Sequence, residues 1–499
     1  MSRREFLQRV ALGTAALAAE SHAHAAPRRK RPNVLYVFSD QHRAVSMPDQ
    51  AHSPVIAPAL AAFKRQGLSM ERCISNYPLC TPYRAMLMSG RWPYQTGVIA
   101  NNIALDPGQV SLGSWFQQHG YHTGYVGKWH LQGRGIRFVP AGPARHGFAD
   151  WRVWVNTNAH FHSWSYDQLS GARIDATGWS CARMSDDALD FIHAQPRDRP
   201  WFLMLSLNPP HPPFNAVRAD VERYQAEALP LRPNVALPPP ASRGGAESRL
   251  LESEHTLRLA MQGYYGAISG VDGQFARLLQ ALEESGQAED TIVIYTSDHG
   301  EMMGSQGRMA KQVPFEEAVR VPFLLRYPGV TRPGEQSSLL FSAVDIYPSL
   351  CGLAGLPVPA FCVGRDLSPA MRGESVEAPA YAFLMNQSGD DVEDGRQAGD
   401  RWPDQAAPSS DVAADAKFVA QPKYRGVRTA THTYAVALAG RWCLYDNVND
   451  PYQMNNLVRD PHQLALMMRL DAAIADWLDR GGDPFPYAQA VQRFADFPV

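Results

Sequence analysis

Five residues in three separate stretches of the chain could bind a metal ion and an oxyanion. They are Asp40 and Gln41, then Cys80 in the pentapeptide Cys-Thr-Pro-Tyr-Arg, and finally Asp298 and His299. Carboxylate, amide and imidazole groups bind divalent metals, and a bound ion polarises the oxygens that it contacts. A cysteine alone is more often a small buried apolar residue. The three stretches are therefore informative only together.

Two apolar runs must position the pairs Asp40-Gln41 and Asp298-His299. Residues 32–38 are rich in β-branched and aromatic side chains, and residues 291–296 form a second run of this kind. Each run is typical of a buried strand in a parallel sheet, and each ends just before its polar pair. Sites in open α/β sheets lie beyond the carboxyl ends of the strands, so we expect both pairs to meet at one edge.

The same kind of pattern predicts the fold class. Further strand-like runs occupy residues 201–207 and 321–326, and apolar spacing over residues 262–284 indicates one face of a long helix. Strands that alternate with helices predict an α/β fold with a large, mostly parallel mixed sheet sandwiched by helices. We expect this catalytic domain to span residues 31–377.

A smaller α+β subdomain is expected over residues 378–499. Residues 464–478 have the spacing of a closing helix, and residues 386–417 form a polar insertion with little apolar content. Short strand-like runs predict a small antiparallel sheet at 424–429, 433–436 and 442–446.

Five blocks along the chain together resemble the formylglycine-dependent sulfatases, a branch of the alkaline phosphatase superfamily. The blocks are Asp40-Gln41; Cys80-x-Pro82-x-Arg84, continuing into residues 87–90; residues 120–130, which end in Gly-Lys128-Trp-His130; Pro209-Pro210-His211-Pro212; and Asp298-His299-Gly300, leading to Lys311 and residues 320–322. One such block is weak, because an Asp after a strand is commonly a turn residue. Their joint order is specific, and it implies an alkaline phosphatase-like fold and the hydrolysis of sulfate esters.

The resemblance implies that Cys80 is oxidised to formylglycine by a formylglycine-generating enzyme. The hydrated aldehyde has two geminal hydroxyls, one of which is an oxygen nucleophile. The other can expel the sulfate by regenerating the aldehyde. Tyr83 departs from the small residue that is common in this motif, but Cys80, Pro82 and Arg84 are intact. We therefore expect the modification to occur.

The resemblance also implies one divalent metal ion, with ligands from Asp40, Gln41, the modified Cys80, Asp298 and His299. The family often has Asp-Asp and Asp-Asn where this chain has Asp-Gln and Asp-His, so the four unmodified ligands carry two negative charges instead of three. Calcium, which the family suggests, prefers oxygen donors. Imidazole favours manganese or another transition metal. We expect calcium, with manganese as the alternative.

Five further residues receive roles from the resemblance. Arg84 and Lys128 would hold the formylglycine and balance the carboxylates, and Lys311 would bind the sulfate oxygens. His130 would assist the collapse of the hemiacetal. His211 would protonate the departing alcohol.

Two other functions stay open at this point. The related phosphonate monoester hydrolases and phosphodiesterases also use formylglycine, although Lys128 and His130 together give the sulfatase form of their block. An alternative of a different class is a binding protein that kept the fold and lost catalysis. The complete set of site residues argues against that alternative.

Two segments are candidates for recognising the substrate. Residues 151–166 are dense in Trp, His and Asn, which either contact a sugar ring or pin a surface loop. The acidic insertion 386–417 would repel a highly sulfated polymer. We therefore expect a small-molecule or saccharide sulfate ester. A net charge of −2 over 499 residues gives no long-range field for nucleic acid.

Residues 1–25 have the form of a twin-arginine signal peptide. Arg3 and Arg4 precede an apolar stretch at residues 10–19, and Ala23-His24-Ala25 is an A-x-A cleavage pattern. The stretch is shorter than the roughly 20 residues that span a bilayer, so we expect no stable membrane anchor. The Tat translocase would export the folded protein to the periplasm or the medium, where Cys351 and Cys362 are the one cysteine pair close enough in sequence to suggest a disulfide.

Overall fold

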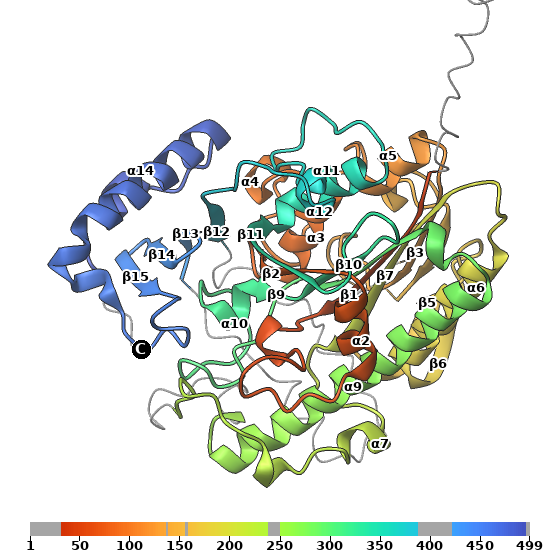
Figure 1. Ribbon diagram of the computed structural model, residues 1–499, viewed down its shortest axis with the longest axis horizontal. Coiled ribbons are helices and arrows are strands. Elements are labelled where there is room, and N and C mark those ends of the chain that lie inside the picture. The colour runs from red at the N-terminus through yellow and green to blue at the C-terminus, as the bar shows by residue number, and fades with distance from the viewer. Residues whose placement is uncertain (1–30, 136–137, 155–157, 238–249, 388–421, 496–499) are drawn as a thin grey trace, which may run out of the picture.

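A large sheet covered by helices forms the body of the protein, and a smaller sheet lies beside it (Figure 1). The computed structural model describes residues 31–135, 138–154, 158–237, 250–387 and 422–495. The predicted fold class, a mostly parallel mixed sheet with helices and a small antiparallel sheet, is confirmed. The expected signal peptide and most of the expected insertion lie outside the described residues.

The large sheet contains nine strands, and five neighbouring ones run parallel at its centre and one side. In spatial order the main path is β11 (Glu335–Ser342), β2 (Leu68–Ile74), β10 (Phe323–Arg326), β8 (Thr291–Ser297), β1 (Asn33–Asp40), β7 (Trp201–Pro210), β3 (His122–Gly127) and β4 (Asp150–Val153). The short β9 (Arg320–Val321) pairs with β2, and β5 (Phe161–Tyr166) forms a separate antiparallel pair with β6 (Arg173–Trp179).

The central strand β1 separates two apolar cores. Its residues from Val34 to Phe38 are 0% exposed. Val34, Tyr36 and Phe38 pack into one cluster, whereas Leu35 and Val37 pack into another on the opposite face. Because side chains alternate along a strand, burial on both faces requires an unbroken apolar run.

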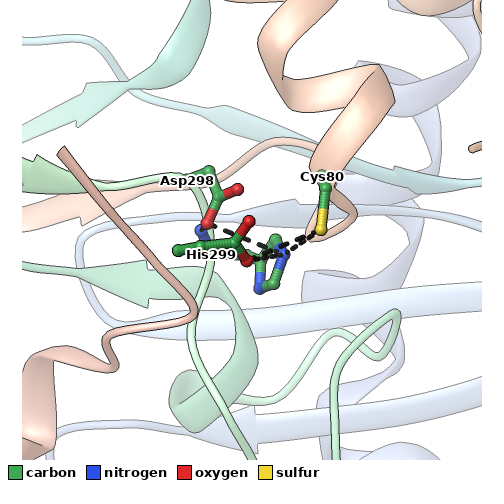
Figure 2. Close-up of side chains that lie close together, drawn as sticks. Cys80, Asp298 and His299 are labelled. Atoms are coloured by element: carbon green, nitrogen blue, oxygen red, sulfur yellow. Dashed lines mark hydrogen bonds and ion pairs between the residues drawn. The ribbon is translucent and has the colours of Figure 1, made fainter. Parts of the chain in front are cut away.

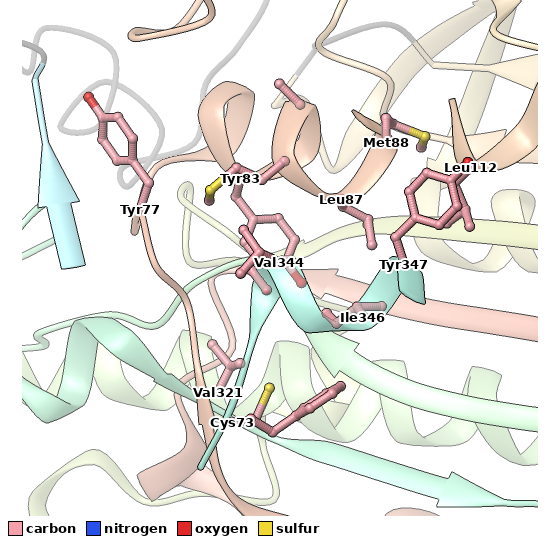
Figure 3. Packing of buried hydrophobic residues seen from close by; sticks show 14 of the residues in the cluster. Cys73, Tyr77, Tyr83, Leu87, Met88, Leu112, Val321, Val344, Ile346 and Tyr347 are labelled. Atoms are coloured by element: carbon pink, nitrogen blue, oxygen red, sulfur yellow. The ribbon is translucent and has the colours of Figure 1, made fainter. Parts of the chain in front are cut away.

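Helices supply the outer layers of both cores. The longer helices on the Leu35 side are α2 (Pro58–Gln66), α6 (Ser180–Ala194) and α9 (Glu254–Glu284). The other face carries α3 (Cys80–Ser89), α5 (Leu112–Gln118) and α11 (Ala343–Leu353). Figure 3 shows part of this second core, where Tyr83 and Leu87 of α3 point toward Val344 and Ile346 of α11. The packing fixes the position of α3, which begins at Cys80.

The small sheet is antiparallel and closes against the large one. Its strands are β12 (Ala382–Asn386), β13 (Tyr424–Arg428), β14 (His432–Ala437) and β15 (Gly440–Asp446), and α14 (Leu464–Gly481) packs on it. Arg428 of β13 lies 2.7 Å from Glu316 of the short helix α10 (Glu316–Val319), which joins the two sheets by an ion pair. The remaining short α-helices are α4 (Pro93–Thr96), α7 (Arg218–Val221), α12 (Ser368–Met371) and α15 (Tyr487–Ala490).

Three details differ from the sequence-based expectation. The run at 321–326 is not one strand: it divides at Pro322, which lacks the N–H that a continuous strand would need, into β9 and the antiparallel β10. Helix α9 begins at Glu254, where the Ser253 hydroxyl caps it, eight residues before the expected start. Cys351 and Cys362 are free thiols.

None of the helices in the described ranges is long and apolar enough to cross a membrane.

Candidate active site

The carboxyl ends of β1 and β8 bring both polar pairs to one edge of the sheet. The strands run parallel with Ser39 opposite Ser297, and the Asp298 amide donates to the Ser39 carbonyl at 3.2 Å. Asp40 is the last residue of β1, and Asp298 directly follows β8. Both carboxylates are 0% exposed. The sheet register alone therefore places two acidic side chains next to each other.

Cys80 is the first residue of α3 and points into this edge (Figure 2). Its Sγ lies 3.2 Å from His299 Nε2 and 3.6 Å from Asp40 Oδ1. Burial, followed by the charge of Asp40, raises the pKa of the Cys80 thiol to about 12. The unmodified side chain is therefore a neutral thiol, and its Sγ marks the position that the formylglycine expected from the sequence would occupy.

Arg84, one helical turn after Cys80, bridges the two carboxylates. Its Nη2 lies 3.1 Å from Asp40 Oδ2 and 3.2 Å from Asp298 Oδ2. Its Nη1 donates to the Ser206 hydroxyl at 2.7 Å. The rigid fork of a guanidinium suits such bridging, which a flexible ammonium could not reproduce. One oxygen of each carboxylate is thereby held on the arginine side.

His299 faces the other oxygen of each carboxylate. Its Nε2 lies 3.6 Å from Asp298 Oδ1 and 3.8 Å from Asp40 Oδ1. Its Nδ1 is 3.0 Å from the Gly300 carbonyl, a contact in which Nδ1–H must donate, so Nε2 carries the lone pair. Burial lowers the pKa of His299 to about 4, so the imidazole is neutral. This is the form that binds metal ions.

These four side chains form a donor set that fits a divalent cation. One ligand atom from each of Asp40, Cys80, Asp298 and His299 lies within 4.8 Å of the other three, and all four residues are buried. Two carboxylates, one neutral imidazole and a fourth donor suit calcium or a first-row transition metal.

Gln41, the fifth expected ligand, lies beside this set with its side chain already engaged. Its backbone is left-handed, with φ of 74°, and its N–H donates to Asp298 Oδ1 at 3.0 Å. The side-chain Oε1 accepts from the Lys311 ammonium, and Nε2 donates to the Glu301 carboxylate. An amide oxygen has two lone pairs, so Oε1 keeps one besides its bond to Lys311.

Lys128 provides positive charge next to Asp40. Its Nζ lies 2.8 Å from Asp40 Oδ2 and 3.2 Å from the Asn158 side-chain oxygen. Burial by itself would raise the pKa of Asp40, but Lys128, His211 and Arg84 hold it well below its ordinary value. Asp40 is therefore ionised despite its burial.

Lys311 approaches the cluster from the loop that follows β8. Burial by itself would lower the pKa of Lys311, but the neighbouring carboxylates of Asp40 and Asp298 raise it. Lys311 is therefore a charged ammonium at neutral pH, although it is only 3% exposed.

His130 and His211 line the same region and are 7% and 8% exposed. Burial, followed by Lys128 for His130 and Lys311 for His211, holds the pKa of each well below its ordinary value. Nδ1 of His211 lies 2.6 Å from the Pro212 carbonyl, so its Nε2 carries the lone pair. Both histidines are neutral before an anion binds.

Glu301 is the buried site residue that the sequence-based prediction omitted. It is 0% exposed, and its Oε1 accepts from the backbone N–H of Met303 at 2.9 Å and of Ala310 at 2.6 Å. Burial raises the pKa of Glu301, and its N–H donors oppose that rise. The only sequence signal was its position directly after Asp298-His299-Gly300.

The segment 151–166 contributes polar groups at one side of the cluster. Asn158 contacts Lys128, and His160 Nδ1 lies 3.2 Å from the carbonyl of Asn215, in the loop that also carries His211. Trp154 is a core residue, 1% exposed. Residues 155–157 lie outside the described ranges.

Comparisons with known proteins point to one family. The family model named Sulfatase matches residues 32–356. The ulvan-active sulfatase of Formosa agariphila is 31% identical over 461 residues, which are 91% of this chain and 82% of that protein. A solved structure from Bacteroides thetaiotaomicron, described under the metabolism of multiple glycosaminoglycans, has a TM-score of 0.76 and 27% identity, and the match covers 93% of this chain and 99% of that one.

A phosphonate monoester hydrolase of Agrobacterium radiobacter has the same fold. Its TM-score is 0.70 at 22% identity, with 90% of this chain and 96% of that chain covered. The fold is thus common to both enzyme classes, whereas the family match and the more identical relatives are sulfatases. The metal ion and formylglycine that this family implies also fit the donor set around Cys80. The family model matches more than half of the chain, so we conclude that this protein belongs to the sulfatase family and is a sulfuric ester hydrolase.

Proposed function

We propose that the protein hydrolyses the sulfate ester of a sugar or another small alcohol, with formylglycine formed from Cys80. The observation that carries the proposal is the position of Cys80, whose Sγ lies within 4.8 Å of donor atoms of Asp40, Asp298 and His299. Formylglycine at this position supplies an oxygen nucleophile, which the neutral thiol cannot replace.

The side chains around Cys80 would bind and orient the sulfate group. Lys128 and Lys311 are buried cations that attract an anion more strongly as water is excluded. Arg84 holds one oxygen of Asp40 and one oxygen of Asp298, so the other oxygen of each carboxylate stays directed toward His299. Asp40, Asp298 and His299 would hold a divalent cation there, which would supply Lewis acidity to the nucleophile and to the sulfate group.

His211 and His130 are proposed to move protons. Nε2 of His211 is the atom that would carry a proton to the departing alcohol, because Nδ1 is engaged by the Pro212 carbonyl. His130 would assist regeneration of the aldehyde. Its Nδ1 has no hydrogen-bond partner in the part of the chain that the structure describes.

Calcium is the ion that we propose. Oxygen would supply most of the donors, from Asp40, Asp298, Gln41 and the modified Cys80, and calcium prefers such a shell. The imidazole of His299 is the one donor that favours manganese instead.

A saccharide is the proposed alcohol. The Nδ1–H of His160 is engaged by the Asn215 carbonyl, so Nε2 is an acceptor, and burial lowers the pKa of His160 to about 4. His160 is 1% exposed and its Nε2 has no hydrogen-bond partner among the residues described, so a sugar hydroxyl that supplied one would have to enter the buried side of the site. The relative named for its activity on ulvan supports the same class.

Export through the Tat translocase to the periplasm or the medium is proposed from the sequence of residues 1–25. The Arg3-Arg4 pair and the Ala23-His24-Ala25 pattern support it. A formylglycine-generating enzyme would act on Cys80 before this export.

The mass of the peptide that contains Cys80, from protein isolated from the periplasm, should be that of the aldehyde. Cys80→Ala should leave the unfolding midpoint near the parent value and abolish turnover of an aryl sulfate. Turnover of the matched phosphodiester should be slower than that of the sulfate in the parent. An unmodified thiol in active exported enzyme would contradict the proposal.

His211→Gln should slow the hydrolysis of sulfate esters with poor leaving groups more than that of esters with good ones. We expect a loss of about 10²- to 10⁴-fold in kcat with an alkyl sulfate, the range for general acid catalysis, and a much smaller loss with 4-nitrophenyl sulfate. His211 must be protonated to act as the acid. The kcat/KM of the parent enzyme should therefore fall as the pH rises through the lowered pKa of His211 in the free enzyme. A bound anion raises the pKa of His211, so kcat should begin to fall at a higher pH than kcat/KM does. Equal losses on both substrates would rule out this role.

Chelation should abolish turnover, and added Ca²⁺ should restore it. His299→Asn exchanges a nitrogen donor for an oxygen donor, so it should raise the affinity for Ca²⁺ relative to Mn²⁺ by on the order of tenfold, or about 1.4 kcal/mol. Metal titrations of the chelated parent and variant would measure this ratio. Recovery of the parent with Mn²⁺ alone would identify manganese as the ion.

Sulfated mono- and oligosaccharides should be better substrates than choline sulfate or aryl sulfates. His160→Ala should lower kcat/KM for the saccharide about fivefold, because one hydrogen bond contributes about 1 kcal/mol, and should leave aryl sulfate turnover near the parent rate. Steady-state kinetics on both substrates would test this. An equal effect on saccharide and aryl sulfates would rule out a role for His160 in recognising the saccharide.

A further inference from the structure

One buried carboxylate beside the site has no role in the chemistry above. The two oxygens of Glu301 accept three N–H groups, from Met303, Ala310 and the side chain of Gln41. A buried carboxylate is costly unless such bonds satisfy it, and packing alone would be served by an apolar residue. Its position between two functional segments therefore needs an explanation.

The amide of Gln41 lies between two groups of opposite hydrogen-bonding character. Its Nε2 faces Glu301, which as a carboxylate only accepts, and its Oε1 faces Lys311, which only donates. The backbone is fixed as well, because Gln41 N–H donates to Asp298 at 3.0 Å and its carbonyl accepts from the Tyr264 hydroxyl at 2.8 Å. Only one orientation of the amide satisfies both neighbours.

The same carboxylate closes the loop that delivers Lys311. The Met302 N–H donates to the Ala310 carbonyl at 2.8 Å, which forms the neck of the loop. Ala310 has a φ of 63° and turns the chain directly before Lys311, and its N–H is held by Glu301. Glu301 thus connects this loop with the end of β1.

We infer that Glu301 is a positioning residue that sets the direction of the Gln41 amide and so holds the Lys311 ammonium on the Gln41 oxygen. The inference rests on the proposed function, in which Gln41 contacts the ion and Lys311 contacts sulfate. Glu301 acts through the direction of a hydrogen bond: an acceptor must face Gln41 Nε2. A purely structural role would be met by any side chain that keeps the bonds to Met303 and Ala310.

Glu301→Gln separates these two roles. It keeps one oxygen for the two backbone N–H groups but sets a new NH₂ against the NH₂ of Gln41. Gln41 would then rotate and turn its NH₂ toward Lys311. We expect kcat/KM to fall about 10- to 100-fold, as for groups that orient metal ligands, and the dissociation constant for inorganic sulfate to rise. Calorimetry on the calcium-loaded protein measures the second quantity.

Exchanging the two side chains should restore the arrangement. In Gln41→Glu/Glu301→Gln, the amide at position 301 donates to the carboxylate at position 41, whose other oxygen accepts from Lys311. The double variant should regain most of the lost kcat/KM and sulfate affinity. Gln41→Glu alone sets two carboxylates against each other and should be impaired. This non-additivity is the signature of direct coupling.

Glu317→Gln is the matched control. Glu317 is 1% exposed, and its side chain accepts from Arg232 and Asn234. Its backbone carbonyl, which the substitution leaves in place, accepts from the Glu301 N–H at 2.9 Å. The Glu317→Gln variant should keep the kcat/KM and the sulfate affinity of the parent enzyme, even if its unfolding midpoint is lower.

Two results would overturn the inference: parent-like sulfate binding in Glu301→Gln, or a double variant no better than Glu301→Gln. Should Glu301→Gln fail to fold, the double variant decides, since recovered folding and activity support the inference and continued loss refutes it. A lack of formylglycine at Cys80 would remove turnover but leave the sulfate-binding measurement intact. The failure of the inference is thus distinguishable from that of the proposed function.

Discussion

The mutual repulsion of two buried carboxylates is the constraint on which the rest of the site depends. Asp40 and Asp298 are held together by the parallel register of β1 and β8, so neither can withdraw without breaking the ladder between the strands. Arg84 resolves the repulsion by bonding one oxygen of each, while its guanidinium lies 4.9 Å from the centre of the Phe38 ring. Without this cation, Asp40 would keep its ion pair with Lys128, but the buried Asp298 would lose its ion pair with Arg84.

The charge balance around this bridge suits the site to an anionic ester. Its three carboxylates and three cations cancel formally: Asp40, Asp298 and Glu301 against Arg84, Lys128 and Lys311. A divalent ion would then give the site a net positive charge toward an incoming anion. Sulfate monoesters and phosphate diesters both carry one negative charge, so one scaffold can serve both classes. The fold alone therefore does not distinguish a sulfatase from a phosphonate monoester hydrolase.

Sequence patterns predicted the parts of this structure that depend on local spacing. The runs before Asp40 and Asp298 are uninterrupted because both faces of their strands are buried, and the helix that begins at Cys80 places Arg84 one turn away. Strand direction could not be predicted, because an apolar run indicates that a strand is buried but not whether it runs parallel or antiparallel to its neighbours. For this reason the antiparallel β10 could not be anticipated. The role of Glu301 was hidden as well, since its partner Gln41 is 260 residues away in the chain.

The burial of Cys80 limits the time at which an enzyme could reach it. The residue is 1% exposed in the folded protein, beneath a contact with His299, which is 219 positions further along the chain. At about 5–20 residues per second of synthesis, the ribosome needs roughly 10–40 s to make that interval. For most of this time Cys80 has left the ribosome, whereas His299 has not yet been synthesised. The proposed oxidation of Cys80 would have to occur before the sheet is complete, and the long separation of the two segments along the chain lengthens the time available for it.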